Sequence, residues 1–150
     1  MSNQYLSRNI HSVFHLRWLA AGVLAMGLVA HTGCGGRETY QVSGRAQYKD
    51  GSPITGGVRV IRLDPAQDTS AEIRKAASSN IAEDGSFEMF TRRPGDGVIP
   101  GRYAVTFTVL DKAMGGRSLI PEKFTQGNST PFELVVDDDK TDLLFELEKM

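Results

Sequence analysis

The chain has 150 residues, 40% of which are hydrophobic, so it accommodates one domain of ordinary size. Its formal net charge is −1, and the part that follows the first 33 residues holds 15 basic against 18 acidic side chains. Such weak acidity argues against a nucleic-acid-binding protein, because phosphates require a clustered basic surface.

A short apolar segment near the N-terminus follows two basic residues. Arg8 and Arg17 precede the run Trp18–Ala30, an arrangement typical of the charged and apolar regions of a secretory signal peptide. A helix made from these 13 residues would be about 20 Å long, too short for a hydrocarbon core of about 30 Å. The sequence therefore predicts a cleaved signal peptide over residues 1–33 rather than a transmembrane helix.

The residues directly after this run, His31-Thr32-Gly33-Cys34, resemble the lipobox of bacterial lipoproteins. In that family, small residues precede a cysteine that is acylated and becomes the new N-terminus. Thr32 and Gly33 fit the pattern, whereas His31 stands where the family usually has an aliphatic residue. The resemblance implies lipidation at Cys34. Ordinary secretory cleavage after Ala30 is the alternative, and it would leave Cys34 as a free thiol.

A lipid anchor at Cys34 would hold the rest of the chain close to a membrane. Acyl chains contribute about 0.8 kcal/mol per buried methylene group, and more than one chain gives stable attachment. Residues 34–38 form the expected tether, whose reach is on the order of 15 Å. Gly35, rather than aspartate, follows the cysteine. By resemblance to the sorting rule of two-membrane bacteria, this implies the outer membrane or the cell surface.

Histidine chemistry is lost with the signal peptide, because His11, His15 and His31 all precede Cys34. Cys34 is also the only cysteine. The mature chain would therefore have no histidine to activate a nucleophile, no disulfide within the chain and no Cys/His metal site. We expect a protein that is not an enzyme, with no catalytic residue, no cofactor and no metal ligand.

From Thr39 onward, hydrophobic residues alternate with polar ones and turn residues recur, without a long helical pattern. The expected strands are residues 40–48, 58–63, 72–77, 86–91, 102–109, 132–136 and 143–147. We expect the strand at 102–109 to be central, a bulge near Val60, and a hairpin turn at Glu83–Gly85. The pattern predicts an all-β domain over residues 39–150, a seven-stranded antiparallel Greek-key sandwich.

Five short turn motifs punctuate this region. They are Val42-Ser43-Gly44, Tyr48-Lys49-Asp50-Gly51-Ser52-Pro53, Gly56-Gly57-Val58, Asp84-Gly85-Ser86-Phe87 and Pro100-Gly101-Arg102-Tyr103. Together they resemble the carboxypeptidase regulatory-like, transthyretin-like sandwich of many small bacterial lipoproteins. The resemblance covers roughly residues 39–147 and implies a non-catalytic accessory module. Transthyretin-like hydrolases of 5-hydroxyisourate use histidines and a C-terminal Tyr-Arg-Gly-Ser, which have no counterpart in the mature chain.

An acidic run, Asp137–Asp139, raises a calcium-binding alternative, because hard cations prefer carboxylate oxygens. Counted from the first of these residues, the EF-hand pattern finds acids at its third position and at its twelfth, Glu148. Asp142, however, stands where that loop needs glycine, and residues 143–147 alternate like a strand. The pattern favours a solvated turn.

Two further groups of residues would suit a ligand surface. The candidates for an anion-binding patch are Arg92, Arg93, Arg102 and Arg117. Charges of this kind more often protect a sheet edge from pairing. The candidates for a carbohydrate platform are Tyr40, Tyr48, Phe90 and Phe124. Most of these aromatic residues are expected in the core, because large apolar side chains are usually buried.

The sequence favours a membrane-tethered, non-catalytic lipoprotein, a structural or protein-interaction module at the cell envelope. Its edge strands and its long loop, Asp111–Thr130, would contact an envelope partner, and this loop is the expected site of mobility. The alternative is a surface lipoprotein that binds polysaccharide or calcium. A hydrolase that uses aspartate and glutamate alone is the least favoured, because no carboxylate pair can be placed from the sequence.

Overall fold

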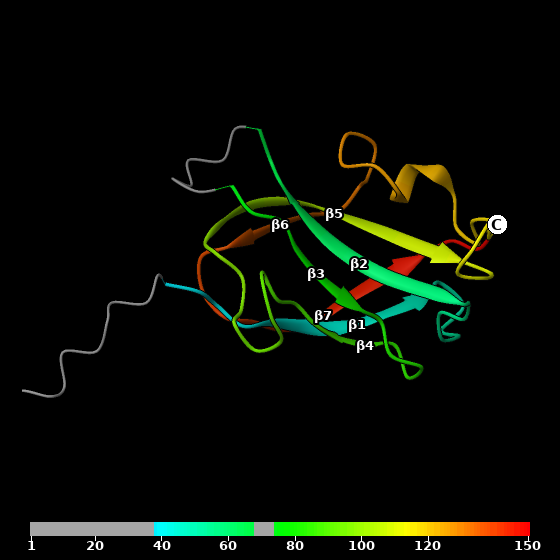
Figure 1. Ribbon diagram of the computed structural model, residues 1–150, viewed down its shortest axis with the longest axis horizontal. Coiled ribbons are helices and arrows are strands. Elements are labelled where there is room, and N and C mark those ends of the chain that lie inside the picture. Colours follow the sequence, from blue (N-terminus) through cyan, green and yellow to red (C-terminus); the bar gives the residue numbers. More distant parts are fainter. Residues whose placement is uncertain (1–37, 68–73) are drawn as a thin grey trace, which may run out of the picture. The chain divides into compact units, whose positions relative to one another are not determined.

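The computed structural model describes residues 38–67 and 74–150. Within those residues, the strands drawn in Figure 1 form two sheets, and one hydrophobic core lies between them. The strands are β1 (Val42–Tyr48), β2 (Val58–Pro65), β3 (Ala77–Asn80), β4 (Ser86–Glu88), β5 (Gly101–Leu110), β6 (Glu133–Val136) and β7 (Lys140–Leu147). The prediction of an all-β sandwich is confirmed.

The two sheets have the strand orders β4-β1-β7 and β3-β2-β5-β6. Every pair of neighbouring strands is antiparallel except β1 and β7, which run parallel with Tyr48 opposite Leu147. The prediction of a wholly antiparallel sandwich is therefore wrong. The reason is that the turn after β6 carries the chain into the other sheet. There β7 starts opposite Val42, at the same end as β1, and must run in the same direction.

The turn Glu83–Gly85 is present, but it does not form the predicted hairpin. The backbone N–H of Ala82 donates to the carbonyl oxygen of Ser86 at 2.9 Å, which closes the turn. The flanking strands then separate, because β3 pairs with β2 whereas β4 pairs with β1. An isolated bridge between Ser78 and Phe90 links the two segments farther along. The turn thus carries the chain from one sheet to the other.

The bulge expected near Val60 is also wrong, because β2 pairs with β5 in continuous register along its whole length. Val58 and Val60 are half-buried and alternate with the inward-facing residues of β2. Arg59 takes the inward phase at the start of the strand. Its guanidinium donates to the carbonyl oxygens of Ile81 at 3.1 Å and Gly56 at 2.9 Å. The change of hydrophobic phase therefore reflects an inward arginine rather than an extra residue.

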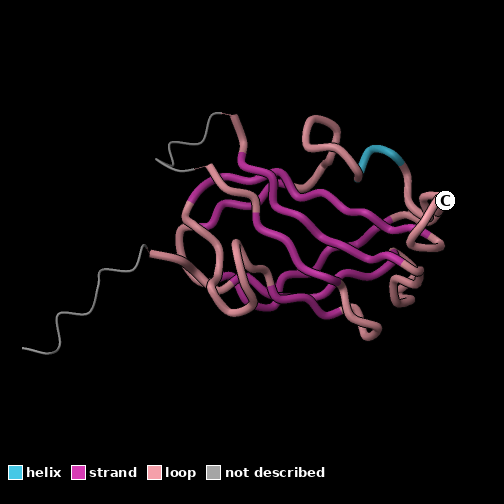
Figure 2. The backbone as a smooth tube through the Cα atoms, in the orientation of Figure 1, coloured by secondary structure: helices cyan, strands magenta, loops and turns pink. Residues whose placement is uncertain are grey.

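The core lies between the sheets, and β5 crosses its centre as predicted, between β2 and β6. The buried inward residues of β5 are Tyr103, Val105, Phe107 and Val109. The long connection after β5 contains a short 3₁₀ helix, η1 (Glu122–Phe124), drawn in cyan in Figure 2. Phe124 is buried and stacks on Phe132, with ring centroids 5.7 Å apart. This part of the loop is therefore anchored to the core.

Candidate functional site

The predicted lipidation site, Cys34, lies outside the described residues, as do residues 1–33 and the tether up to residue 37. The described chain begins at Glu38, whose carboxylate accepts a hydrogen bond from the Tyr40 hydroxyl at 2.6 Å. This hydrogen bond raises the pKa of the Tyr40 phenol. Tyr40 then exchanges two backbone hydrogen bonds of 2.9 Å with Val98. In the part of the chain that the structure describes, no helix has the length and apolar character to cross a membrane.

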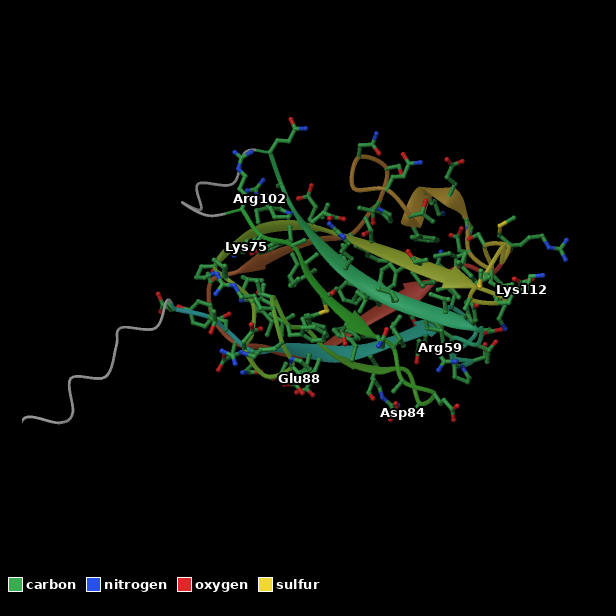
Figure 3. All side chains as sticks on the ribbon, in the orientation of Figure 1. Arg59, Lys75, Asp84, Glu88, Arg102 and Lys112 are labelled. Carbon is green, nitrogen blue, oxygen red and sulfur yellow. The ribbon has the colours of Figure 1, made fainter. Side chains whose placement is uncertain are left out.

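A trough of about 770 Å³ lies along the β4-β1-β7 sheet. Its lining includes outward-facing side chains of these three strands, together with Ser79 and Asn80 of β3 and Ala82 after it, and the turn at Pro94 and Gly95 borders it. Figure 3 shows Glu88 on the side of this sheet that faces away from the other sheet. The volume falls within the range of roughly 300–1,000 Å³ that is usual for ligand sites. The trough is therefore the candidate ligand site of the described residues.

A bulge in β7 places Asp142 at the trough. Between the pair Val42–Lys140 and the pair Gly44–Leu143, β7 has one residue more than β1. Asp142 takes a φ of 62°, a left-handed conformation that aspartate tolerates better than most residues. Gly44 lies against this bulge, because a Cβ atom at Gly44 would overlap the carbonyl oxygen of Leu143. The absence of a side chain at Gly44 thus permits the bulge.

Two carboxylates flank a hydroxyl group across the sheet. Ser43 lies opposite Glu88 in β4 and, on its other side, opposite the bulge that contains Asp142. Neighbouring strands are about 4.8 Å apart, so the backbones that carry the two carboxylates are about 10 Å apart. Neither carboxylate makes an ion pair or a side-chain hydrogen bond with another described residue. Their negative charges are therefore available to a ligand.

The next row of side chains has no net charge. Arg45 Nη2 lies 3.2 Å from Asp84 Oδ2, and the other oxygen of Asp84 accepts hydrogen bonds from the hydroxyl and backbone N–H of Ser86. The bonds from Ser86, followed by the charge of Arg45, lower the pKa of Asp84. Leu144 lies opposite Arg45 in β7 and is 56% exposed. The trough thus combines an acidic row, formed by Glu88, Ser43 and Asp142, with a neutral and partly apolar row, formed by Ser86, Arg45 and Leu144.

The acidic run Asp137–Asp139 forms a turn between β6 and β7 rather than a cation site. The ammonium group of Lys140 contacts its first two carboxylates, and hydrogen bonding to Lys140 lowers the pKa of Asp137. The third carboxylate accepts the backbone N–H of Gln41 at 2.8 Å. Glu148 lies beyond the far end of β7, so the EF-hand spacing closes no loop. Over residues 38–67 and 74–150, no group of three or more potential ligands is placed to hold a metal ion.

The four candidate arginines do not form one patch. Arg92 and Arg93 lie in the turn before β5, and Arg102 is the second residue of that strand. Arg117 lies beyond the other end of β5, where its backbone N–H donates to Asp111 at 2.8 Å. A strand of ten residues spans about 30 Å, which separates Arg117 from the others. Figure 3 shows the same separation between Arg102 and Lys112.

The four aromatic candidates do not form one exposed platform either. Tyr48 and Phe124 are buried in the core, as expected for most of the group. Tyr40 and Phe90 are half-buried, and Phe90 borders the trough. The trough therefore offers one partly exposed aromatic ring from this group rather than the flat row of rings that stacks on sugars.

A charged cluster links three separate segments through Glu148. Its carboxylate oxygens accept hydrogen bonds from the ammonium groups of Lys123 at 2.6 Å and Lys49 at 2.8 Å. These bonds, with that from Lys123 the largest cause, lower the pKa of Glu148 to about 2. Because Lys49 follows β1, Lys123 lies in η1 and Glu148 follows β7, the cluster fastens the long loop to both strands.

Glu148→Gln is expected to destabilise the protein at neutral pH but not in strong acid. The folded-state pKa of Glu148 is lower than its ordinary value of 4.5, so its stabilising effect is complete above pH 4.5 and is lost as pH falls through about 2. Urea unfolding at several pH values measures the difference between the variant and the wild type. Glu83→Gln, in an exposed turn, is the control and is expected to show no such difference. A difference for Glu148→Gln that persists below pH 2 would contradict the ion-pair explanation.

The trough was not predicted from the sequence. Ser43, Glu88 and Asp142 lie on three strands, and long-range register brings them together. The one local signal is the polar triplet Lys140-Thr141-Asp142, which interrupts the alternation before Leu143.

Comparison of the chain with protein-family models, curated proteins and solved structures gave no match. The resemblance to the carboxypeptidase regulatory-like family therefore stays a prediction, and the trough must be interpreted from its own geometry.

Proposed function

We propose that the protein is a membrane-tethered, non-catalytic lipoprotein that acts as a structural or protein-interaction module at the cell envelope. The position of Cys34 carries the proposal. This cysteine follows the apolar run Trp18–Ala30 after three residues and precedes the first described residue, Glu38, by four. Acylation at Cys34 would anchor the sandwich at the outer membrane or the cell surface.

The proposal includes the finer fold assignment, a Greek-key sandwich of the carboxypeptidase regulatory-like, transthyretin-like type. The two-sheet arrangement supports it, as do the tight turns at the positions of two of its motifs. In the first turn, the N–H of Gly51 donates to the carbonyl oxygen of Tyr48 at 2.8 Å. In the second, the N–H of Gly85 donates to the carbonyl oxygen of Ala82 at 3.0 Å. Such a scaffold carries its function on surfaces rather than in a conserved catalytic centre.

The chemistry of the trough supports a contact surface rather than a catalytic site. Its serine, Ser43, lies between two carboxylates, and all three histidines of the chain precede Cys34. A serine nucleophile most often needs a neighbouring base such as histidine. An open trough on a rigid sheet, with polar side chains around an exposed leucine, is suited to a partner surface instead. The scattered aromatic candidates give no comparable support to a polysaccharide platform.

Cys34→Ala is expected to abolish both fatty-acid labelling and retention in the membrane fraction. The thiol of Cys34 is the only one in the chain, so its removal leaves no site for thioether or thioester attachment. Metabolic labelling with a radioactive fatty acid and cell fractionation measure the two effects. His31→Leu restores the aliphatic residue usual in the lipobox and is the matched control, with labelling expected to be retained or increased. A wild-type chain that keeps residues ahead of Cys34 and carries no fatty acid would refute the proposal.

A further inference from the structure

We propose that the trough on the β4-β1-β7 sheet binds an extended, basic segment of a partner protein, with a lysine or arginine side chain placed between Glu88 and Asp142. This inference rests on the proposed interaction function and specifies the chemistry of the partner. It concerns the outward face of a sheet that the described residues leave uncovered.

The net charge of the trough determines the sign of the charge on its ligand. Arg45 is already neutralised by Asp84, whereas the carboxylates of Glu88 and Asp142 have no basic partner among the described residues. The net charge that the trough offers is therefore negative. A polyanion such as an acidic polysaccharide would be repelled, and a cationic side chain would be attracted.

The spacing favours an organic cation over a metal ion. The backbones of Glu88 and Asp142 are two strand spacings apart, about 10 Å, with the Ser43 hydroxyl between them. Metal ions need several oxygen ligands within about 2.6 Å, and no such group exists in the described ranges. An ammonium or guanidinium group has several donors and can contact two carboxylates from a position between them.

The apolar part of the trough indicates that the partner is a polypeptide. Leu144 is 56% exposed in the neighbouring row, and Phe90 borders the same surface. In an extended chain, residues two positions apart lie on the same face about 7 Å from each other, so a basic and an apolar residue at this spacing face the trough together. Such a segment can cover Leu144 while a basic residue reaches the acidic row.

The two sides of the acidic row are held in place by backbone structure. Glu88 ends β4 in paired register with Ser43, and the φ of 62° at Asp142 is fixed by the bulge against Gly44. A ligand would therefore meet a surface that needs little backbone rearrangement, which lowers the entropic cost of binding. Bulges of this kind often redirect a side chain beside a binding site.

The test is a binding assay with the full-length chain in mild detergent. The probe is a fluorescent peptide with the sequence Lys-Ser-Leu-Ser-Lys, which places both lysines and the leucine on one face when extended, and fluorescence anisotropy measures its affinity. We expect binding that weakens as salt is added, and affinity about tenfold lower for the double variant Glu88→Gln, Asp142→Asn, as two exposed ion pairs would give. Asparagine also tolerates the left-handed conformation at position 142, so the bulge is preserved.

The matched control removes the same charge elsewhere. The double variant Glu83→Gln, Glu133→Gln changes an exposed turn and the outward-facing side of β6, and it is expected to keep wild-type affinity. A peptide with glutamate in place of lysine is expected not to bind. Equal loss of affinity in both double variants, or no binding of the basic peptide, would overturn the assignment. Binding of chitosan oligosaccharides without binding of the peptide would also overturn it and would identify a glycan partner.

The assay does not depend on acylation, so the two proposals fail separately. Intact fatty-acid labelling without peptide binding would refute the trough assignment alone. Peptide binding by a wild-type chain that is isolated from the cells that export it and carries no fatty acid would refute the membrane tether alone.

Discussion

Gly44→Ala is expected to lower the free energy of unfolding by about 3 kcal/mol, at the upper end of what overpacking usually costs. The added methyl group would overlap the backbone of Leu143, including its carbonyl oxygen, and backbone cannot rotate away as a flexible side chain would. Relief requires β7 to move away from β1, which would weaken the parallel pairing that holds β7 in its sheet. Urea denaturation followed by circular dichroism measures the loss.

Gly127→Ala is the matched control, because it adds the same methyl group at a glycine with room for it. A Cβ atom at Gly127 would lie 3.6 Å from the Cβ of Ala104, an ordinary van der Waals contact. Its expected effect is within about 0.5 kcal/mol of zero, since alanine also reduces the entropy of the unfolded chain. Equal stabilities of the two variants would show that β7 does not approach Gly44 as described.

The strands that could be predicted are those whose burial follows a local alternation. In β5, every second residue from Tyr103 to Val109 is buried, and a similar alternation identifies β1, where Val42, Ala46 and Tyr48 are buried and Gly44 is half-buried. Such alternation indicates which face of a strand is covered but not which strand lies beside it. The parallel pairing of β1 with β7 and the separation of β3 from β4 depend on partners far away in the sequence, and both were mispredicted.

The candidate functional residues also divide into those that a local motif identifies and those that depend on distant partners. Cys34 is identified by its immediate neighbours, so a local motif suffices to predict it, although it lies outside the described residues. The acidic row depends on the register of β1 against β4 and β7, where one extra residue in β7 decides which side chain faces the trough. The residues next to Glu88 in the sequence do not indicate that its carboxylate lies at the trough.

Phe107→Ala is expected to lower the free energy of unfolding by about 4 kcal/mol, as large core truncations generally do. Phe107 is 1% exposed on the central strand, and its ring contacts Phe132 and Phe145 with centroids 5.9 and 5.7 Å away. Phe145 belongs to β7 in the opposite sheet, so the lost ring joins the two sheets directly. The cavity left behind would be lined by rigid rings that cannot collapse into it.

Val135→Ala provides the comparison, because Val135 is apolar and lies on a strand of the same sheet but is 49% exposed. Its truncation is expected to change the free energy of unfolding by no more than about 0.5 kcal/mol. Thermal unfolding of both variants measures the stability of the core. Peptide binding, measured in parallel, reports whether the trough on the outer face is unchanged. Similar losses for the two would mean that Phe107 does not hold the sheets together, and the central position of β5 would then have to be reconsidered.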